Sequence, residues 1–182
     1  MLQGQVAVVS GGLGAIGAAT VRALAQQGAD VAWCDLHPFE KAATLAADVQ
    51  AHGRRAVYDR VDIADAQAVE NWLDVVESAL GTPTLVVPNA AIVGLAPLRE
   101  LSAGGWRSVM AVNLDGAFHM ASSAARRMLE RDLPGRIVFV GSWAADHVHL
   151  QLPAYCVAKA GLRMLSKCMA AALAPQGILV NE

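Results

Sequence analysis

The feature that most constrains the fold of this chain is a regular alternation of short apolar runs with stretches typical of helices. Near-continuous apolar runs indicate strands that are buried on both faces, and intervening helices allow successive strands to lie parallel. The sequence therefore predicts an α/β fold with a doubly wound parallel sheet, as a single domain over residues 1–182. The expected strands are residues 5–9, 30–34, 55–61, 84–87, 136–140 and 178–180, and the expected helices run from the first glycines to about 27, then over 40–51, 66–80, 105–129 and 153–173.

Composition excludes several classes of protein. Apolar residues make up 55% of the chain and charged residues 16%, which argues against disorder. The 14 basic and 16 acidic residues include no cluster of Lys or Arg, so we expect no nucleic-acid partner. Residues 1–21 and 78–98 carry no charge, but the first stretch has four glycines within seven residues and the second is interrupted by prolines. Neither fits a signal peptide or a spanning helix, so no membrane association is expected.

The cysteines and histidines indicate neither a disulfide framework nor a metal centre. The 3 cysteines are an odd number without C-x-x-C spacing, and no export signal precedes them, so we expect free thiols and a cytoplasmic protein. Asp146, His147 and His149 lie close together in sequence. Because two histidines on an extended stretch without a further ligand more often face solvent or substrate, we expect no metal site there.

The first turn, VAVVSGGLGAIGAAT, contains G-x-G-x-x-G directly after a strand and at the start of a helix. Glycines in this pattern allow a tight turn and a close approach of the backbone to a pyrophosphate, while the helix N-terminus supplies free N–H groups. Such turns also occur for packing reasons alone, but an acidic residue eighteen positions beyond the last glycine favours a dinucleotide. We therefore place four residues of this Rossmann-type turn at the cofactor: Gly11, Gly12, Gly14 and Ile16.

The acidic residue is Asp35, at the tip of the second strand, where a carboxylate accepts hydrogen bonds from the adenine ribose hydroxyls. The alternative is that Asp35 caps the following helix. Asp62, at the tip of the third strand, is a candidate adenine contact or another cap. Because a carboxylate repels the 2′-phosphate of NADP, and Leu36 and His37 add no permanent cation, the predicted cofactor is NAD.

The stretch LPAYCVAKAGL holds one phenol and one ammonium, Tyr155 and Lys159, four residues apart on a helix and therefore on the same face. The pair has an ordinary explanation, in which the tyrosine lies at a core edge and the lysine reaches to water. In the alternative explanation the cation makes the phenol more acidic for catalysis. Ser142 ends the fifth strand, where such sheets form their crevice. Asn113 lies inside the helix over 105–129, which costs stability and invites a functional reason.

Taken in this order, the motifs make the whole chain resemble the short-chain dehydrogenase/reductase family. The resemblance rests on the Gly-rich turn, PNAA at 88–91, and the later polar residues, and it implies a catalytic tetrad of Asn113, Ser142, Tyr155 and Lys159. In that family the tyrosine exchanges a proton with the substrate oxygen, the lysine acidifies the phenol and holds the nicotinamide ribose, the serine fixes the substrate oxygen, and the asparagine supports a water relay. Further cofactor contacts are implied at Asn89, Tyr155 and Lys159. Ala15 and Ala91 replace glycines that are usual in the family, and Pro88 replaces an asparagine.

The expected activity is hydride transfer between NAD(H) and a secondary alcohol or ketone. Trp143 and the two histidines of the loop before Tyr155 favour a sugar, polyol or small hydroxy compound as substrate. Two alternatives are a 3-oxoacyl-thioester reductase and a non-catalytic dinucleotide-binding sensor, and an intact tetrad argues against the sensor.

The resemblance also bears on assembly and on the end of the chain. It implies a homo-oligomer, dimer or tetramer, formed through the helices over 105–129 and 153–173. The last expected strand, 178–180, stands just before the end of the sequence, and an end strand normally needs a neighbour or cover. We therefore expect the chain to be truncated before the last strand, without the substrate lid and edge strand that the resemblance implies.

Overall fold

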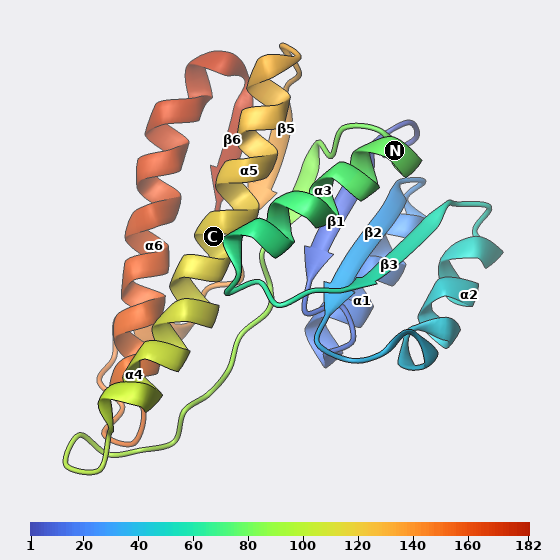
Figure 1. The fold of residues 1–182 in the computed structure, drawn as a ribbon. Coiled ribbons are helices and arrows are strands. Elements are labelled where there is room, and N and C mark those ends of the chain that lie inside the picture. The colour runs from blue at the N-terminus through green and yellow to red at the C-terminus, as the bar shows by residue number, and fades with distance from the viewer.

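The computed structural model describes residues 1–182 as one six-stranded sheet with helices on both faces (Figure 1). The strands are β1 (Val6–Ser10), β2 (Asp30–Asp35), β3 (Ala56–Arg60), β4 (Leu85–Val87), β5 (Gly135–Val138) and β6 (Ile178–Asn181). The α-helices are α1 (Ala15–Gln26), α2 (Ala43–Ala51), α3 (Ala66–Leu80), α4 (Ala103–Met110), α5 (Ala117–Glu130) and α6 (Pro153–Leu173). Short 3-10 turns occupy Phe39–Lys41, Trp143–Ala145 and Ala174–Gln176, and a π-helical segment, Ala111–Gly116, joins α4 to α5.

The order of strands confirms the predicted doubly wound sheet. It is β3-β2-β1-β4-β5-β6, and every neighbouring pair is parallel. The chain builds outward from β1 to β3, then returns to the other side of β1 to begin β4. The connections after β1 and β4 therefore leave the sheet in opposite directions, and the crevice that opens between them is the usual ligand site of such folds.

Alternate residues of the central strands pack into two separate cores. In β1, Val8 packs with residues of α3, α5 and α6, whereas Val9 packs with residues of α1 and α2. In β2, Cys34 belongs to the first core and Trp33 to the second. The central strands are thus buried on both faces, which explains their near-continuous apolar sequence. No helix of the structure combines the length and the apolar composition needed to cross a membrane.

The helix expected over 105–129 is continuous but not regular. It begins two residues earlier, where the Ser102 hydroxyl accepts a hydrogen bond from the Gly105 N–H at 3.0 Å, and it widens to a π-helix over Ala111–Gly116. A π-helical turn inserted in an α-helix often marks a functional site. Here it contains Asn113, and a Cβ added to Gly116 would lie 2.7 Å from the side chain of Ile63. Gly116 therefore allows the helix to pack closely against Ile63.

A cluster of charged side chains joins α3 to α5. The Arg127 side chain is only 8% exposed, and its guanidinium lies 2.8 Å from the Glu70 carboxylate and 2.5 Å from the Asp74 carboxylate. Glu70 also accepts hydrogen bonds from Ser123 and Arg126. Partial burial raises the pKa of Glu70, but these hydrogen bonds outweigh it and bring the pKa to about 2.

This cluster makes the stability of the fold dependent on pH. Because the Glu70 pKa of about 2 lies below its ordinary value of 4.5, the stabilisation is complete above pH 4.5 and is lost as the pH falls through 2. Glu70→Gln should lower the free energy of unfolding at neutral pH by about 1–2 kcal/mol, reduced from the full electrostatic value because the group is partly exposed. Thermal unfolding at neutral and acid pH checks this, with the exposed Glu100→Gln as control. A difference in the free energy of unfolding between wild type and Glu70→Gln that stays constant down to pH 2 would contradict this prediction.

Candidate active site

A cleft lies at the switch point of the sheet, between the connections that follow β1 and β4. Its volume is about 490 Å³, and its walls come from the β1–α1 turn and from the segments that follow β2, β3 and β4. Six of the residues predicted at the cofactor line it: Gly11, Gly14, Ile16, Asp35, Asp62 and Asn89. Gly12, Tyr155 and Lys159 do not line this cleft.

Three glycines of the β1–α1 turn are required by the packing of the chain itself. Gly11 has φ of +63°, and a Cβ there would lie 2.8 Å from the Cα of Ala90. Gly12 packs against Trp33, whose side chain would be 2.6 Å from an added Cβ. Gly17 is the most crowded, because a Cβ would lie 2.1 Å from the Gly11 carbonyl oxygen. Gly12 therefore supports the turn from behind the cleft.

Gly14 differs from these three because nothing in the chain requires a glycine there. Its φ of −71° and ψ of 165° suit any residue, and an added Cβ would meet only the Gly11 carbonyl oxygen, at 3.4 Å. The backbone N–H groups of Ala15, Ile16 and Gly17 find no acceptor in the chain, and the first turn of α1 holds no acidic residue. A bare backbone beside a free helix N-terminus fits the pyrophosphate of a dinucleotide.

Asp35 is joined directly to the glycine-rich turn. One carboxylate oxygen accepts a hydrogen bond from the Leu13 N–H at 3.1 Å, and the other accepts from the Leu36 N–H at 2.8 Å. The 3-10 turn that follows is preceded by Pro38 and has no side-chain cap, so the capping alternative for Asp35 is excluded. Two donors leave a carboxylate with further acceptor capacity, and its side chain lines the cleft.

Asp62 also proves not to be the cap of the next helix. Its carboxylate accepts from the Ala64 N–H at 2.9 Å, in a local turn, whereas the cap of α3 is Asp65. Asp62 is exposed and lines the cleft opposite the glycine-rich turn. It therefore stays a predicted adenine contact.

Asn89 holds the end of β4 against the turn after β1. Its side-chain amide donates hydrogen bonds to the carbonyl oxygens of Ser10 and Gly11, at 2.9 and 3.0 Å. Its backbone N–H donates to the Ser10 hydroxyl at 3.0 Å, as does that of Ala90 at 3.1 Å. Asn89 therefore fixes the two sides of the crevice relative to each other, besides lining it.

Tyr155 and Lys159 lie one turn apart near the start of α6, which has Pro153 as its first residue. The ammonium of Lys159 is 5.7 Å from the centre of the Tyr155 ring and donates a hydrogen bond to the Val140 carbonyl oxygen at 2.7 Å. Lys159 is only 3% exposed, so it does not reach out to water as in the ordinary explanation of the pair. Burial lowers the pKa of Lys159, and the charge of Glu182 opposes this shift.

Asn113 is buried, with 1% exposure, and both polar groups of its side chain bind one residue. Its carbonyl oxygen accepts from the Ile92 N–H and its amide donates to the Ile92 carbonyl oxygen, each at 2.8 Å. Ile92 lines the dinucleotide cleft after β4. Asn113 thereby fixes this wall of the cleft to the π-helical segment.

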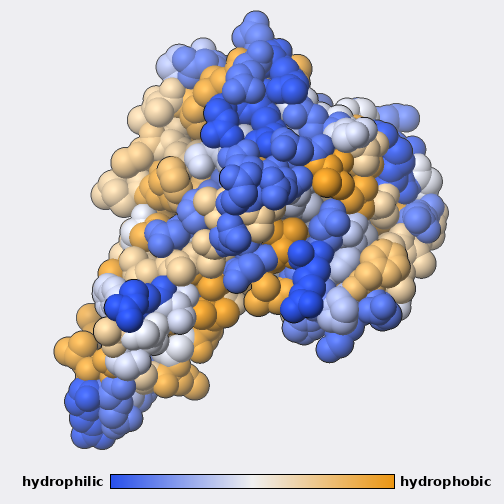
Figure 2. All heavy atoms as spheres, in the orientation of Figure 1, coloured by the Kyte–Doolittle hydropathy of each residue, from blue (hydrophilic) through white to orange (hydrophobic).

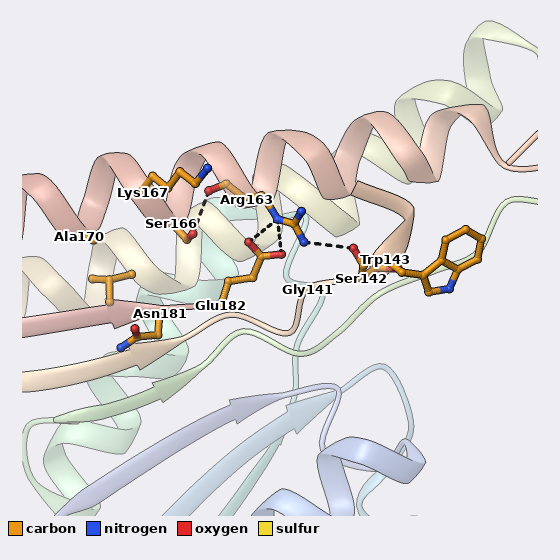
Figure 3. Close-up of a pocket in the computed structure, with 10 residues that line it drawn as sticks. Gly141, Ser142, Trp143, Arg163, Ser166, Lys167, Ala170, Asn181 and Glu182 are labelled. Carbon is orange, nitrogen blue, oxygen red and sulfur yellow. Dashed lines mark hydrogen bonds and ion pairs between the residues drawn. The ribbon is translucent and has the colours of Figure 1, made fainter. Parts of the chain in front are cut away.

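Ser142 follows β5 in an extended conformation, and its hydroxyl accepts a hydrogen bond from the Ala144 N–H at 3.2 Å. The next residue, Trp143, is 61% exposed, and its ring centre lies 6.0 Å from that of His147 and 5.9 Å from that of His149. Ser142 and Trp143 also line a second cavity of about 580 Å³, between α6 and the end of β6 (Figure 3).

The structure joins part of the predicted tetrad through backbone atoms. Tyr155 and Lys159 are in contact, and the Lys159 bond to Val140 brings them to the segment after β5, in which Ser142 follows two residues later. Asn113 is linked instead to the cleft at the switch point, through Ile92. The sequence did not predict Val140 and Ile92 as partners. They take part through backbone N–H and carbonyl groups, which every residue has, so no residue type marks them.

No group of three or more His, Cys, Asp and Glu side chains is arranged to hold a metal ion. Asp146 pairs with Arg163, and that hydrogen bond lowers the pKa of the Asp146 carboxyl. The rings of His147 and His149 lie near that of Trp143 in tilted orientations.

The sheet and the cleft at its switch point are those of a protein of the dinucleotide-binding α/β class. The chain matches the short chain dehydrogenase family over residues 5–182 and belongs to that family. This match confirms the resemblance predicted from the sequence. Members of this family use NAD or NADP and act on small-molecule substrates.

Several named dehydrogenases are similar to this chain in sequence and structure. The chain is 40% identical over 182 residues to D-threitol dehydrogenase of Mycolicibacterium smegmatis, covering 99% of this chain and 68% of that protein. It is 32% identical over 180 residues to 2,3-dihydro-2,3-dihydroxybenzoate dehydrogenase of Bacillus subtilis, again covering 99% and 68%. The crystal structure of NAD⁺-bound xylitol dehydrogenase superposes with a TM-score of 0.93 at 30% identity, covering 99% of this chain and 69% of the other.

Proposed function

We propose that this protein is an NAD-dependent dehydrogenase that interconverts a secondary alcohol and a ketone, with residues 1–182 as its catalytic domain. The observation that carries the proposal is the buried Lys159 ammonium, fixed on the Val140 carbonyl oxygen and 5.7 Å from the Tyr155 ring. In the family to which the chain belongs, a tyrosine with a lysine one helical turn further on exchanges a proton with the substrate oxygen. We therefore assign this proton exchange to the Tyr155 phenol.

Each of the four tetrad residues has a separate role in the proposed reaction. Tyr155 takes the proton from the hydroxyl of the alcohol, or returns it to the ketone, while Ser142 donates a hydrogen bond that orients the substrate oxygen. Lys159 supplies positive charge and a donor for the ribose, and Asn113 keeps the cleft wall at Ile92 in place. When bound, NAD supplies the nicotinamide carbon that accepts the hydride.

A polyol or another small hydroxylated compound is the proposed substrate class. Relatives named for D-threitol and xylitol support it, as does the aromatic face of Trp143 beside two imidazoles with hydrogen-bonding nitrogens.

The segment after β4 also reaches the loop that carries Trp143, because the Ala96 N–H donates to the Gln151 carbonyl oxygen at 3.0 Å. Both segments expose apolar side chains, with Leu95 76% and Leu150 78% exposed. Figure 2 shows apolar residues on the surface of the projecting end that carries α4.

The experiment that tests the proposal is formation of NADH from NAD⁺ with a panel of polyols, simple secondary alcohols and 3-hydroxyacyl thioesters. We expect turnover with a polyol or small hydroxy compound. Preferential turnover of the thioesters would favour the reductase alternative. Binding of NAD without turnover of any compound would favour a non-catalytic sensor.

We also propose that the protein forms a homo-oligomer. Helices α5 and α6 expose apolar side chains that a partner copy would cover, among them Phe118 at 47%, Val157 at 47% and Met164 at 58% exposure.

The preference for NAD over NADP is expected to depend on Asp35. Its carboxylate lines the cleft where the adenine ribose would lie, and it would repel the 2′-phosphate of NADP. Wild type should bind NAD at least about tenfold more tightly, a difference of ~1.4 kcal/mol. Asp35→Ala should narrow this gap mainly by admitting NADP, whereas Asp48→Ala, a charge-matched change on α2, should not. Titration of both cofactors measures the ratio, and equal affinities in wild type would remove Asp35 from the site.

A further inference from the structure

Arg163 occupies the next position on the helix face that carries the catalytic pair. Tyr155, Lys159 and Arg163 follow one another at intervals of four residues on α6, so their side chains leave the same face of the helix. The Arg163 side chain is 28% exposed and lies within the second cavity, beside Ser142 and Glu182 (Figure 3).

The guanidinium of Arg163 joins α6 to two segments that meet at this cavity, the loop of residues 141–146 and the residue after β6. Its Nε lies 3.1 and 3.0 Å from the two carboxylate oxygens of Glu182, which follows β6. One terminal nitrogen binds the Asp146 carboxylate, and the other donates to the Ser142 carbonyl oxygen at 3.5 Å. The planar, five-donor guanidinium suits such branching, which the single ammonium of a lysine cannot reproduce.

An isolated ion pair at a surface contributes little, and the Asp146 carboxylate alone, 59% exposed, would be such a case. Glu182 is different, because its side chain is only 13% exposed and packs on the backbone just before the catalytic serine. A Cβ added to Gly141 would lie within 2.6 Å of the Cγ of Glu182. The Glu182 side chain thus lies against Gly141, while Arg163 also donates to the Ser142 carbonyl oxygen.

The hydroxyl of Ser142 has no such support of its own. Its one hydrogen bond within the chain comes from the Ala144 N–H in the same loop, at 3.2 Å. The direction of the hydroxyl therefore depends on how the backbone of residues 141–146 is held, and Arg163 contacts that backbone from α6.

We propose that Arg163 is a positioning residue for the dehydrogenase reaction, which fixes the backbone of the Ser142 loop to α6 and to Glu182 so that the Ser142 hydroxyl meets the substrate oxygen. The inference rests on the proposed function, because it assigns Ser142 the role of orienting that oxygen. It predicts that Arg163 acts on turnover through Ser142 and not through the dinucleotide cleft, whose lining does not include Arg163.

The test is a double-mutant cycle between Arg163→Ala and Ser142→Ala, with turnover and NAD affinity measured for each variant. Arg163→Ala alone should lower kcat about tenfold, as a small misplacement of a catalytic group does, and leave NAD affinity unchanged. In the Ser142→Ala background the same change should cause little further loss. Arg163→Lys should recover only part of the activity, and Arg22→Ala, which breaks a surface pair with Asp48 on the α1 side, should have no effect. Equal losses in both backgrounds, or no loss in either, would overturn the proposal.

Amide hydrogen exchange separates this inference from the proposed function. Arg163→Ala should speed exchange in residues 142–152 and leave the glycine-rich turn, residues 11–17, unchanged. If wild type or Ser142→Ala shows no measurable turnover, the exchange comparison alone tests the role of Arg163. Faster exchange confined to residues 142–152 then supports the proposal that Arg163 fixes this loop, even if the proposed activity is wrong. Unchanged exchange in that loop overturns it.

Discussion

Replacing Tyr155 with phenylalanine should lower turnover by about 10²–10⁴, the usual contribution of a general acid–base group. The phenyl ring preserves the packing against Val109 and Ala154, but the exchangeable proton is gone. Cofactor affinity should be nearly unchanged, because the substitution removes one hydroxyl group and no charge. Steady-state turnover and NADH binding, measured on the same preparation, separate the two effects.

Tyr58 is a matched control for this change, since it is the other tyrosine of the chain. Its hydroxyl donates to the His37 carbonyl oxygen at 2.5 Å, and its ring lies 5.9 Å from that of Trp33, away from α6. Tyr58→Phe should therefore retain turnover. Turnover of Tyr155→Phe within a few-fold of wild type would remove this residue from the chemistry. Lys159→Met should behave differently, and weaken both turnover and cofactor binding.

Gly17→Ala should destabilise the fold by about 3 kcal/mol, through overpacking that the backbone must relieve. The added methyl would lie 2.1 Å from the Gly11 carbonyl oxygen and 2.9 Å from the Asn89 amide nitrogen. The helix-propensity gain of alanine offsets only part of this, at about 1 kcal/mol. For a chain of this length the melting temperature should fall by roughly 6–12 °C.

Gly14→Ala provides the comparison, because its methyl would make only an ordinary contact of 3.4 Å with the chain. We expect a loss of no more than about 1 kcal/mol, from the less favourable residue at the N-cap of α1. NAD affinity, by contrast, should fall several-fold, since the methyl would occupy the cleft. Thermal unfolding and NAD titration of both variants are the measurements. Similar unfolding of the two variants, or full NAD affinity in Gly14→Ala, would contradict the distinction between a packing glycine and a cofactor glycine.

The fold was predictable from the sequence because the central strands are apolar and are followed by helices. Val8 and Val9 face opposite cores, for example, so β1 is apolar at nearly every position. Asp35 was also predictable, since a single acidic residue closes the second strand at the spacing a dinucleotide site requires. The irregular part was not: the π-helical segment around Asn113 arises from tertiary contacts with Ile92 and Ile63, which lie more than twenty residues away in sequence.

The candidate site was predictable in its residue types but not in its connections. The Tyr155–Lys159 spacing fixed their contact, because helix geometry alone determines which residues lie one turn apart. Helix geometry could not show that Lys159 is anchored on the Val140 carbonyl oxygen. Nor could the sequence pair Arg163 with Glu182, since a lone arginine in a helix is ordinarily a solvated residue and the register of β6 decides what it meets.

The most direct test of the account is the transfer of deuterium from substrate to cofactor. Polyols and secondary alcohols deuterated at the carbinol carbon are incubated with NAD⁺ and the protein, and the NADH is analysed by mass spectrometry. The account predicts NADH that carries one deuterium with at least one polyol or small hydroxy compound, and no such product with Tyr155→Phe. Absence of labelled NADH with every compound, from protein shown to bind NAD, would contradict the assignment of this chain as a dehydrogenase.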